Sequence, residues 1–305
     1  MRIGVTGSSG LIGTALVSAL TERADEVVRF VRPGTSFDPE AVIRWNPATN
    51  DVDETDLQRV GGLDAVVHLA GAGIAERRWS EARQSEITVS RTKSTALLVS
   101  AIGALPSGCA TVASGSAIGY YGSRSDEVLD ETSSAGQDFL AGVCSAWEAN
   151  AAPLRDLGTS VAYVRTGIVM SADGGALAKQ LPLFRLGLGG RLSTGRQWLS
   201  PISLEDEVRA ILWLIDHGAD GPFNLTAPAP LTNADFTHTL ARALHRPAVA
   251  VVPAFALELA LGHDLAHEAV LASQRVLPRR LLEQGFTFRD PDAAAILARA
   301  LTKHA

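Results

Sequence analysis

The sequence predicts an α/β fold, in which a doubly wound, parallel, Rossmann-like sheet carries a smaller, mostly helical C-terminal region. Short apolar runs alternate with helical patterns over the first two thirds of the chain. A glycine cluster lies between the first apolar run and the first helical pattern. Strands that are separated by helices pair in parallel through right-handed crossovers, and a doubly wound sheet is the natural result.

The spacing of the apolar residues predicts the individual elements. The runs that predict strands are 3–6, 26–31, 41–45, 64–71, 109–115 and 160–169. The patterns that predict helices are 14–22, 81–102, 139–157 and 204–217. From residue 246 onward the sequence predicts mostly helices, in "PAFALELALG", "HEAVLASQRV", "PRRLLEQG" and "DAAAILARAL".

Composition excludes several classes of protein. Hydrophobic residues make up 46% of the 305 residues, which is enough for a sizeable core. The net charge of −6 argues against a nucleic-acid partner, and no apolar run approaches the roughly 20 residues of a membrane helix. Cys109 and Cys144 form neither a disulfide framework nor a metal motif, so we expect a reduced, cytoplasmic setting. His263 and His267 have the spacing of a metal pair, but no third ligand is recognisable nearby, and we expect no metal.

The glycine cluster has the form GxxGxxG and predicts a dinucleotide site. Gly7 allows a tight turn, Gly10 lets a pyrophosphate approach the backbone, and Gly13 lets the helix lie close to the strand. The N–H groups at the start of that helix attract an anion. The expected contacts with the diphosphate are Gly7, Ser9, Gly10, Leu11, Ile12 and Gly13. The alternative is a tight strand–helix turn that binds nothing.

The end of the second strand indicates which dinucleotide is bound. An NAD site usually carries Asp or Glu about 20 residues after the glycines, whereas an Arg there suits a 2′-phosphate. This strand ends in Val31-Arg32, with Arg29 shortly before and no acid. A guanidinium binds a phosphate bidentately and a carboxylate repels it, so the sequence favours NADP(H). The alternative is that Arg32 is a solvated loop residue.

The expected domains follow from these elements. Residues 1–170 form an NADP-binding Rossmann-like domain, to which sheet strands from about 200–226 also contribute. Residues 171–305 form a smaller substrate or lid region that includes the helical segment 246–305. We expect a monomer or a homodimer that acts on a small molecule.

Several motifs together resemble the extended short-chain dehydrogenase/reductase (SDR) family. They are "DAVVHLAG", "SGSAIGYYG", "VRTGIVM" and "LSPISLEDEV". Three further stretches resemble its atypical branch, often labelled epimerase-like or division-inhibitor-like, which carries a short C-terminal segment of unassigned role: "RLGLGGRLSTGRQW", "NLTAPAPLTNADF" and "LASQRVLPRRLLEQGFTF". The resemblance covers essentially the whole chain.

The resemblance implies further cofactor contacts. Leu69, Ala70 and Gly71 end the fourth strand, where the family passes the adenosine ribose and the diphosphate. Glu86 and Arg91 lie on the helix that flanks the cofactor groove in this branch, and a solvated helix surface is the alternative. Ile168 resembles the strand-end position beside the nicotinamide, although packing alone also explains an isoleucine there.

The catalytic pair of the family is missing from the expected place. Ordinary members use Tyr-xxx-Lys on the helix after the fifth strand, in which the Tyr transfers a proton and the Lys lowers its pKa. If Glu148 is aligned with the acid that commonly follows the pair, Leu140 and Cys144 occupy the two positions, and a shift by one residue gives Phe139 and Val143. "DFLAGVCSAWEAN" contains neither tyrosine nor lysine.

Other residues are candidates for the proton transfer. Tyr121 aligns with a substrate-side tyrosine of extended members, Ser116 lies nearest the usual serine, and Tyr120 adjoins them. A phenol needs a nearby cation to act near neutral pH, and Lys179, Arg185 and Arg191 lie in plausible downstream loops. Aromatic packing under a glycine-rich turn explains the tyrosines equally well.

The substrate side also departs from the family. Nucleotide-sugar enzymes commonly carry an Arg where this chain has Leu199, so a sugar nucleotide is a less favoured substrate. The loop with Arg191, Arg196, Gln197 and Trp198 suits either a small anionic ligand or solvent. Two hypotheses follow: an NADP(H)-dependent oxidoreductase or epimerase-like enzyme with a non-standard proton donor, or a non-catalytic NADP(H)-binding sensor or regulator.

Overall fold

A single large sheet organises the molecule. In the computed structural model, which describes residues 1–35 and 41–302, its strand order is β13-β8-β6-β5-β1-β2-β3-β4. All neighbours pair in parallel except β3 and β4, which are antiparallel. The strands are β1 (Arg2–Thr6), β2 (Glu26–Val31), β3 (Val42–Asn46), β4 (Asp51–Val52), β5 (Leu63–His68), β6 (Cys109–Ala117), β8 (Ser160–Thr166) and β13 (Gly221–Leu225). The chain builds outward from β1 in both directions, so the ends of β1 and β5 form the topological switch point, where such sheets bind ligands.

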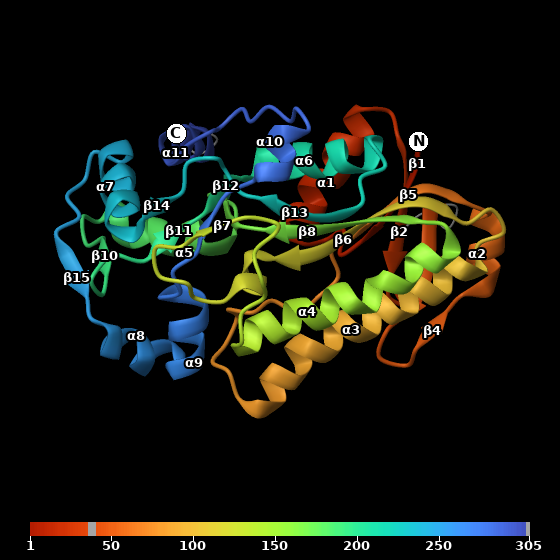
Figure 1. Cartoon of the computed structure of the whole chain (residues 1–305), viewed down its shortest axis with the longest axis horizontal. Helices are drawn as coiled ribbons and strands as arrows, with labels where there is room; N and C mark the ends of the chain where they lie inside the picture. Colours follow the sequence, from red (N-terminus) through yellow and green to blue (C-terminus); the bar gives the residue numbers. More distant parts are fainter. Residues whose placement is uncertain (36–40, 303–305) are drawn as a thin grey trace.

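Helices cover both faces of the sheet, as Figure 1 shows. One face carries α1 (Leu11–Glu22) and α6 (Leu204–Asp216), which bury apolar residues such as Leu16 and Ile211. The opposite face carries α3 (Glu81–Ala104) and α4 (Phe139–Ala151), and α2 (Glu54–Val60) lies near the β3–β4 edge. This arrangement confirms the predicted doubly wound α/β fold.

A smaller region follows β8 and has its own core. Its apolar residues include Leu177 of α5 (Gly175–Arg185), Phe236 of α7 (Asn233–Ala243) and Ile296 of α11 (Ala293–Thr302). The part of the chain after β8 also contains short paired strands: β9 (Ile168–Met170) with β12 (Pro201–Ser203), β10 (Gly190–Leu192) with β15 (Ala250–Val252), and β11 (Trp198–Leu199) with β14 (Leu231–Thr232). A fourth pair, β16 (Arg275–Val276) with β7 (Val128–Leu129), connects it to the segment that follows β6.

The chain from residue 246 onward contains more than the predicted helices. Its helical elements are α8 (Ala254–Leu261), α9 (His263–Leu265), the π-helix η4 (Ala266–Val270), α10 (Arg279–Glu283) and α11. Strand β15 precedes them and β16 lies between η4 and α10, so the predicted helix in "HEAVLASQRV" ends at Val270. None of the helices within 1–35 and 41–302 is long and apolar enough to cross a membrane.

Two other predicted elements are divided. The expected strand 160–169 breaks at Gly167, because its N–H bonds Leu225 while the next N–H, of Ile168, bonds Ser200. A Cβ on Gly167 would lie 2.5 Å from the Ser200 carbonyl oxygen, so the crossing requires glycine. The expected helix 139–157 is α-helical to Ala151 and continues as the 3-10 helix η3 (Ala152–Leu157). Pro153, which lacks an N–H, lies at that change.

Candidate functional site

The glycine turn between β1 and α1 is closely packed. Gly7 has a φ of +65°, and a Cβ there would lie 2.8 Å from the Leu69 carbonyl oxygen. A Cβ on Gly13 would lie 2.2 Å from the Gly7 carbonyl oxygen. Gly10 is the N-cap of α1, and no side chain caps the helix. The exposed backbone at Ser9 and Gly10 therefore leads into a helix start suited to an anion.

A buried histidine fixes the neighbouring strand end. The Thr6 hydroxyl accepts hydrogen bonds from the backbone N–H groups of Leu69 (3.0 Å) and Ala70 (3.1 Å) and lies 2.8 Å from His68 Nδ1. Because both acceptor positions of the hydroxyl are occupied, its own proton goes to Nδ1. Nε2 then carries the ring proton and donates to Thr95 Oγ1 at 3.0 Å. Burial lowers the pKa of His68 to about 3, so the ring is neutral.

The other predicted contacts of the adenosine end lie at this same edge. Val31 is the buried last residue of β2, and the exposed Arg32 follows it. The Arg32 carbonyl accepts hydrogen bonds from the N–H and hydroxyl of Thr35 in a tight turn. Since β2 runs parallel to β1, Arg32 leaves the sheet on the side of the glycine turn.

Glu86 and Arg91 have different surroundings. Arg91 Nη1 donates to the carbonyls of Ala72 and Ile87, and its guanidinium lies 4.9 Å from the centroid of the Trp147 ring. Burial lowers the pKa of Arg91, and its side chain lies within 3.2 Å of where a Gly71 Cβ would be. Arg91 thus supports the loop that follows β5.

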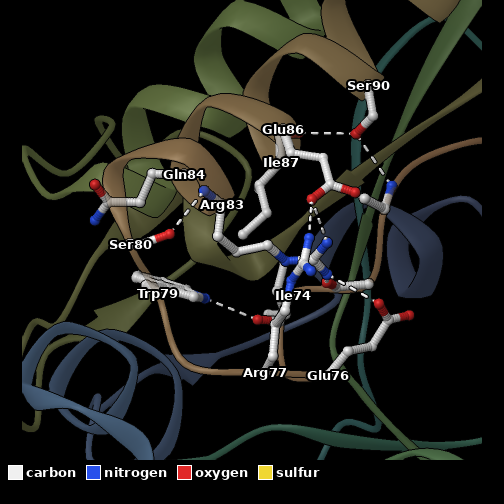
Figure 2. A network of polar contacts seen from close by, with 12 residues as sticks. Ile74, Glu76, Arg77, Trp79, Ser80, Arg83, Gln84, Glu86, Ile87 and Ser90 are labelled. Atoms are coloured by element: carbon white, nitrogen blue, oxygen red, sulfur yellow. Dashed lines mark hydrogen bonds and ion pairs between the residues drawn. The ribbon is translucent and has the colours of Figure 1, made fainter.

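Glu86 belongs to an ion-pair network that joins exposed residues to the buried Arg83, shown in Figure 2. Its carboxylate lies 2.5 Å from Arg77 Nη2 and 2.8 Å from Arg83 Nη1. These hydrogen bonds lower the pKa of Glu86, and Arg83 also bonds Glu76 at 2.9 Å. The network therefore holds the carboxylate within the 73–86 region.

The opposite end of the site has an apolar contact where the family places its catalytic pair. A Cβ on Gly119 would lie 3.5 Å from Leu140 Cβ and 3.7 Å from Cys144 Sγ. Burial raises the pKa of the Cys144 thiol to about 12. Helix α4 contains neither tyrosine nor lysine, so neither residue of the usual pair is available from it. Ile168 is half-buried. It is the first residue of β9 and follows shortly after the end of β8.

A buried polar network lies beside this contact. Arg165, on β8, makes two hydrogen bonds to Glu148 of α4, at 2.8 and 2.9 Å. Ser116 Oγ donates to Glu148 Oε1 at 2.7 Å. Arg165 Nη1 also donates to the Tyr121 hydroxyl (3.0 Å), which in turn donates to Asn224 Oδ1 (2.7 Å). Although burial disfavours the cation, these contacts raise the pKa of Arg165.

The three candidate proton donors differ in access. Tyr121 is 0% exposed, and burial raises its pKa to about 12. Ser116 is buried, with its hydroxyl on Glu148. Tyr120 is half-buried, and the Arg165 guanidinium carbon lies 3.5 Å from its ring centroid. Tyr120 is therefore the most accessible of the three, and their catalytic roles stay predictions.

Arg165, the cation beside the tyrosines, was not predicted from the sequence, which suggested cations in downstream loops instead. Lys179 instead donates to the Ala75 carbonyl at 2.8 Å. Arg185 and Arg191 are exposed in the smaller region. Arg165 sits within the apolar stretch "SVAYVRTGIV", where a strand arginine between valine and threonine gives no sign of its partners.

The loop before β11 is split between solvent and packing. Arg191 and Arg196 are exposed, whereas Gln197 is buried and donates to the Leu192 carbonyl at 3.2 Å. Trp198 lies under the Arg275 guanidinium, 4.2 Å from ring centroid to guanidinium carbon. Of the four residues predicted for an anionic ligand in this loop, Arg191 and Arg196 are thus the exposed ones.

The paired C-terminal histidines contact each other and an acid. The rings of His263 and His267 stack 4.5 Å apart, and His267 Nε2 lies 2.7 Å from Glu258 Oε1. Over 1–35 and 41–302, no group of three or more His, Cys, Asp or Glu residues has metal-site geometry.

The sheet, its switch point and the glycine turn define the class of dinucleotide-binding α/β proteins. The sequence pattern of the "NAD dependent epimerase/dehydratase family" matches residues 3–226, and a "domain of unknown function (DUF1731)" matches residues 252–300. The chain belongs to the NAD dependent epimerase/dehydratase family, as an atypical, SDR-like member. The predicted family resemblance is confirmed.

Individual relatives cover nearly the whole chain. "Epimerase family protein Mb2239" of Mycobacterium bovis is 43% identical over 302 residues, 99% of this chain and 98% of its own. "Epimerase family protein SDR39U1 homolog, chloroplastic" of Arabidopsis thaliana is 37% identical, covering 95% and 83%. The crystal structure of human epimerase family protein SDR39U1 with NADPH superimposes with a TM-score of 0.88 at 31% identity, covering 99% of both chains.

Proposed function

We propose that this chain binds NADP(H), with the diphosphate at the start of α1 and the 2′-phosphate on Arg32. The observation that carries this proposal is an exposed arginine, directly after a strand end without an acid in "VVRFVRPG", at the edge where the glycine turn lies. The NADPH in the human SDR39U1 structure supports it. The geometry of Gly7 and Gly13 fits a cofactor that approaches the backbone closely.

Titration calorimetry with Arg32→Asp tests the cofactor assignment. The substitution removes a charge-assisted contact and adds repulsion, so NADPH binding weakens by about 1–3 kcal/mol while NADH binding changes little. Arg246→Asp, an exposed arginine of the smaller region, makes the same charge change and leaves both affinities as in the wild type. Wild-type protein that binds NADH as tightly as NADPH contradicts the 2′-phosphate assignment.

For the chemistry we propose an oxidoreductase or epimerase-like reaction on a small molecule, with Tyr120 as the proton donor. The Arg165 guanidinium lies against the Tyr120 ring, where a positive charge favours developing negative charge on the phenol. Arg165 would thus take the electrostatic part that a lysine plays in ordinary members. Glu148 and Tyr121 hold the guanidinium in that place.

A second candidate function is a non-catalytic NADP(H)-binding sensor or regulator. It is favoured by the apolar contact of Gly119 with Leu140 and Cys144, in the place where the family has its reactive pair. Such a protein would respond to the ratio of reduced to oxidised cofactor through binding alone.

Turnover assays separate the two candidates. Protein saturated with NADPH is mixed with a panel of carbonyls and quinones, and the absorbance of the reduced nicotinamide is followed. For an enzyme, Tyr120→Phe lowers the rate about a hundredfold at unchanged NADPH affinity. Unchanged turnover in both Tyr120→Phe and Tyr121→Phe contradicts the proton-donor proposal, and no turnover with any member of the panel favours the sensor.

The setting and assembly of the protein remain proposals as well. We infer a reduced, cytoplasmic environment, which suits the two free, buried cysteines Cys109 and Cys144. We also propose a monomer or a homodimer. Light scattering on the purified chain distinguishes these two states.

A further inference from the structure

The C-terminal segment passes beside the end of the candidate site that carries the two tyrosines. We define the strap as residues 273–277, which include β16 and match part of the domain of unknown function. On one side, its residue Gln274 donates its N–H to the Trp198 carbonyl at 3.0 Å and accepts from Ser200 Oγ at 2.8 Å. On the other side, β16 pairs with β7, and Leu277 donates to the Leu129 carbonyl at 2.8 Å. The strap therefore joins the smaller region to the loops that follow β6.

The side chain of Gln274 contacts both ends of the turn that carries the two tyrosines. This turn is the 3-10 helix η2 (Ile118–Tyr121). Gln274 Nε2 donates to the Ile118 carbonyl at 3.0 Å and to the Gly122 carbonyl at 3.2 Å. An amide supplies two N–H donors, so one side chain satisfies two carbonyls, one at each end of η2.

The π-helix that precedes the strap in the C-terminal segment contacts the start of α4. Glu268, in the π-helix η4, accepts a hydrogen bond from the backbone N–H of Leu140 at 3.0 Å. Leu140 lies in the first turn of α4, whose N-cap is Asp138. A second acceptor from a distant segment thus binds a helix start that already has a local cap. Leu140 and Gly119 of η2 are the two surfaces that meet at the apolar contact.

We propose that Gln274 and Glu268 are positioning residues, through which the C-terminal segment sets η2 and the start of α4 around the nicotinamide end of the cofactor. This proposal rests on the proposed binding of NADP(H) and gives the C-terminal domain of unknown function a role. The adenosine end, built on β1, β2 and β5, has no contact with the strap among the hydrogen bonds of the described residues. Through its hydrogen bonds, the strap therefore contacts the end of the site that contains η2 and not the adenosine end.

The test uses the full-length chain with the substitution Gln274→Glu. The two side chains are of equal size, but the carboxylate replaces the two N–H donors and faces the carbonyls of Ile118 and Gly122. Gln284→Glu, on an exposed residue of the same segment, is the matched control for charge. Gln274→Met removes the donors without adding charge and serves if the first variant does not fold. Three quantities are measured: affinity for 2′,5′-ADP, fluorescence lifetime of the nicotinamide in bound NADPH, and hydrogen exchange of amides 118–122.

The proposal requires that the effect of the substitution be confined to the end of the site that contains η2. In Gln274→Glu, exchange at 118–122 rises about tenfold and the lifetime falls toward that of free NADPH, while 2′,5′-ADP binds as in the wild type. Gln274→Met changes the same quantities in the same direction but less. Unchanged exchange and lifetime overturn the proposal, as does a rise in exchange that includes β1 and α1 equally, which is a general loss of stability.

A failure of the proposed cofactor binding can be distinguished from a failure of this proposal. If wild-type protein binds neither 2′,5′-ADP nor NADPH, the proposed function is wrong, and exchange at 118–122 in the ligand-free variants still decides whether the strap holds this end.

Discussion

The two ends of the candidate site differ in composition, because one consists mainly of backbone and the other of side chains. The adenosine end consists mainly of backbone: the turn at Gly7, the start of α1 and the strand end at Leu69, with one exposed side chain, Arg32. The nicotinamide end consists of buried side chains that contact one another, from Ser116 through Glu148, Arg165 and Tyr121 to Asn224, each on a different element. A backbone site depends on a short local pattern, whereas a side-chain site depends on contacts between distant residues.

Breaking the backbone-built end has the largest expected effect. In Gly13→Ala the new Cβ would lie 2.2 Å from the Gly7 carbonyl oxygen, which cannot move without displacing β1. We expect a loss of about 5 kcal/mol in the free energy of unfolding and no NADPH binding, by urea denaturation and calorimetry. Gly142→Ala is the control, because a Cβ there meets nothing within 4 Å and α4 gains helix propensity. Equal stability of the two variants contradicts the close approach of α1 to β1.

Breaking the side-chain end has the next largest effect. Glu148→Ala leaves the Arg165 guanidinium buried without its carboxylate, which costs about 3–5 kcal/mol in the free energy of unfolding. Affinity for 2′,5′-ADP stays at the wild-type value under folding conditions, because the adenosine end does not share the network. Glu148→Leu combined with Arg165→Met removes both charges and recovers much of the loss. A double variant no more stable than Glu148→Ala would show that the unpaired charge is not the cause.

The pH dependence of stability sharpens the comparison, beginning with Glu207, which lies in the first turn of α6 against the end of β8. Its carboxyl bonds Thr166 at 2.7 Å, and burial raises its pKa from 4.5 to about 8. Stability from this group is present below pH 4.5 and is lost as pH rises toward 8, since only the unfolded state ionises in that window. Glu207→Gln therefore removes a fall of roughly 2.5 kcal/mol between pH 5 and pH 7 from the denaturation profile. An unchanged slope refutes a protonated Glu207.

His68, at the adenosine end, produces the opposite slope. Its pKa is lowered from 6.5 to about 3, so its contribution to stability is present above pH 6.5 and is lost as pH falls toward 3. From pH 7 to pH 5 the loss is about 2 kcal/mol. His68→Gln, which does not titrate, flattens this part of the profile, as urea denaturation at several pH values would detect. If His68→Gln still loses this stability between pH 7 and pH 5, another group is responsible for the loss.

Local chemistry made part of the candidate site predictable. Gly7 and Gly13 are required by the turn in which they lie, and Arg32 follows its strand directly, so short patterns predict all three as cofactor contacts, and these contacts stay predictions. Arg165 was not predicted, because its partners Glu148 and Tyr121 are 17 and 44 residues away in the chain. The fold class was predictable because the alternation of strands and helices is itself local.

Tyr120 and Tyr121 illustrate what the local sequence could not predict. Nothing in "IGYY" distinguishes a residue that enters the core from one that stays half-exposed, and packing against Leu129 and Val276 decides that Tyr121 is the buried one. The role of Gln274 was equally hidden, since its acceptors on η2 precede it by more than 150 residues.

The position of the strap late in the chain has a consequence for biosynthesis. All eight strands of the large sheet leave the ribosome before residue 273 is added, so the glycine turn can form on the nascent protein while the tyrosine turn still lacks its tie. Until the tail is added, η2 lacks the two hydrogen bonds from the Gln274 side chain. The tyrosine turn is therefore completed only when the last part of the chain has been made.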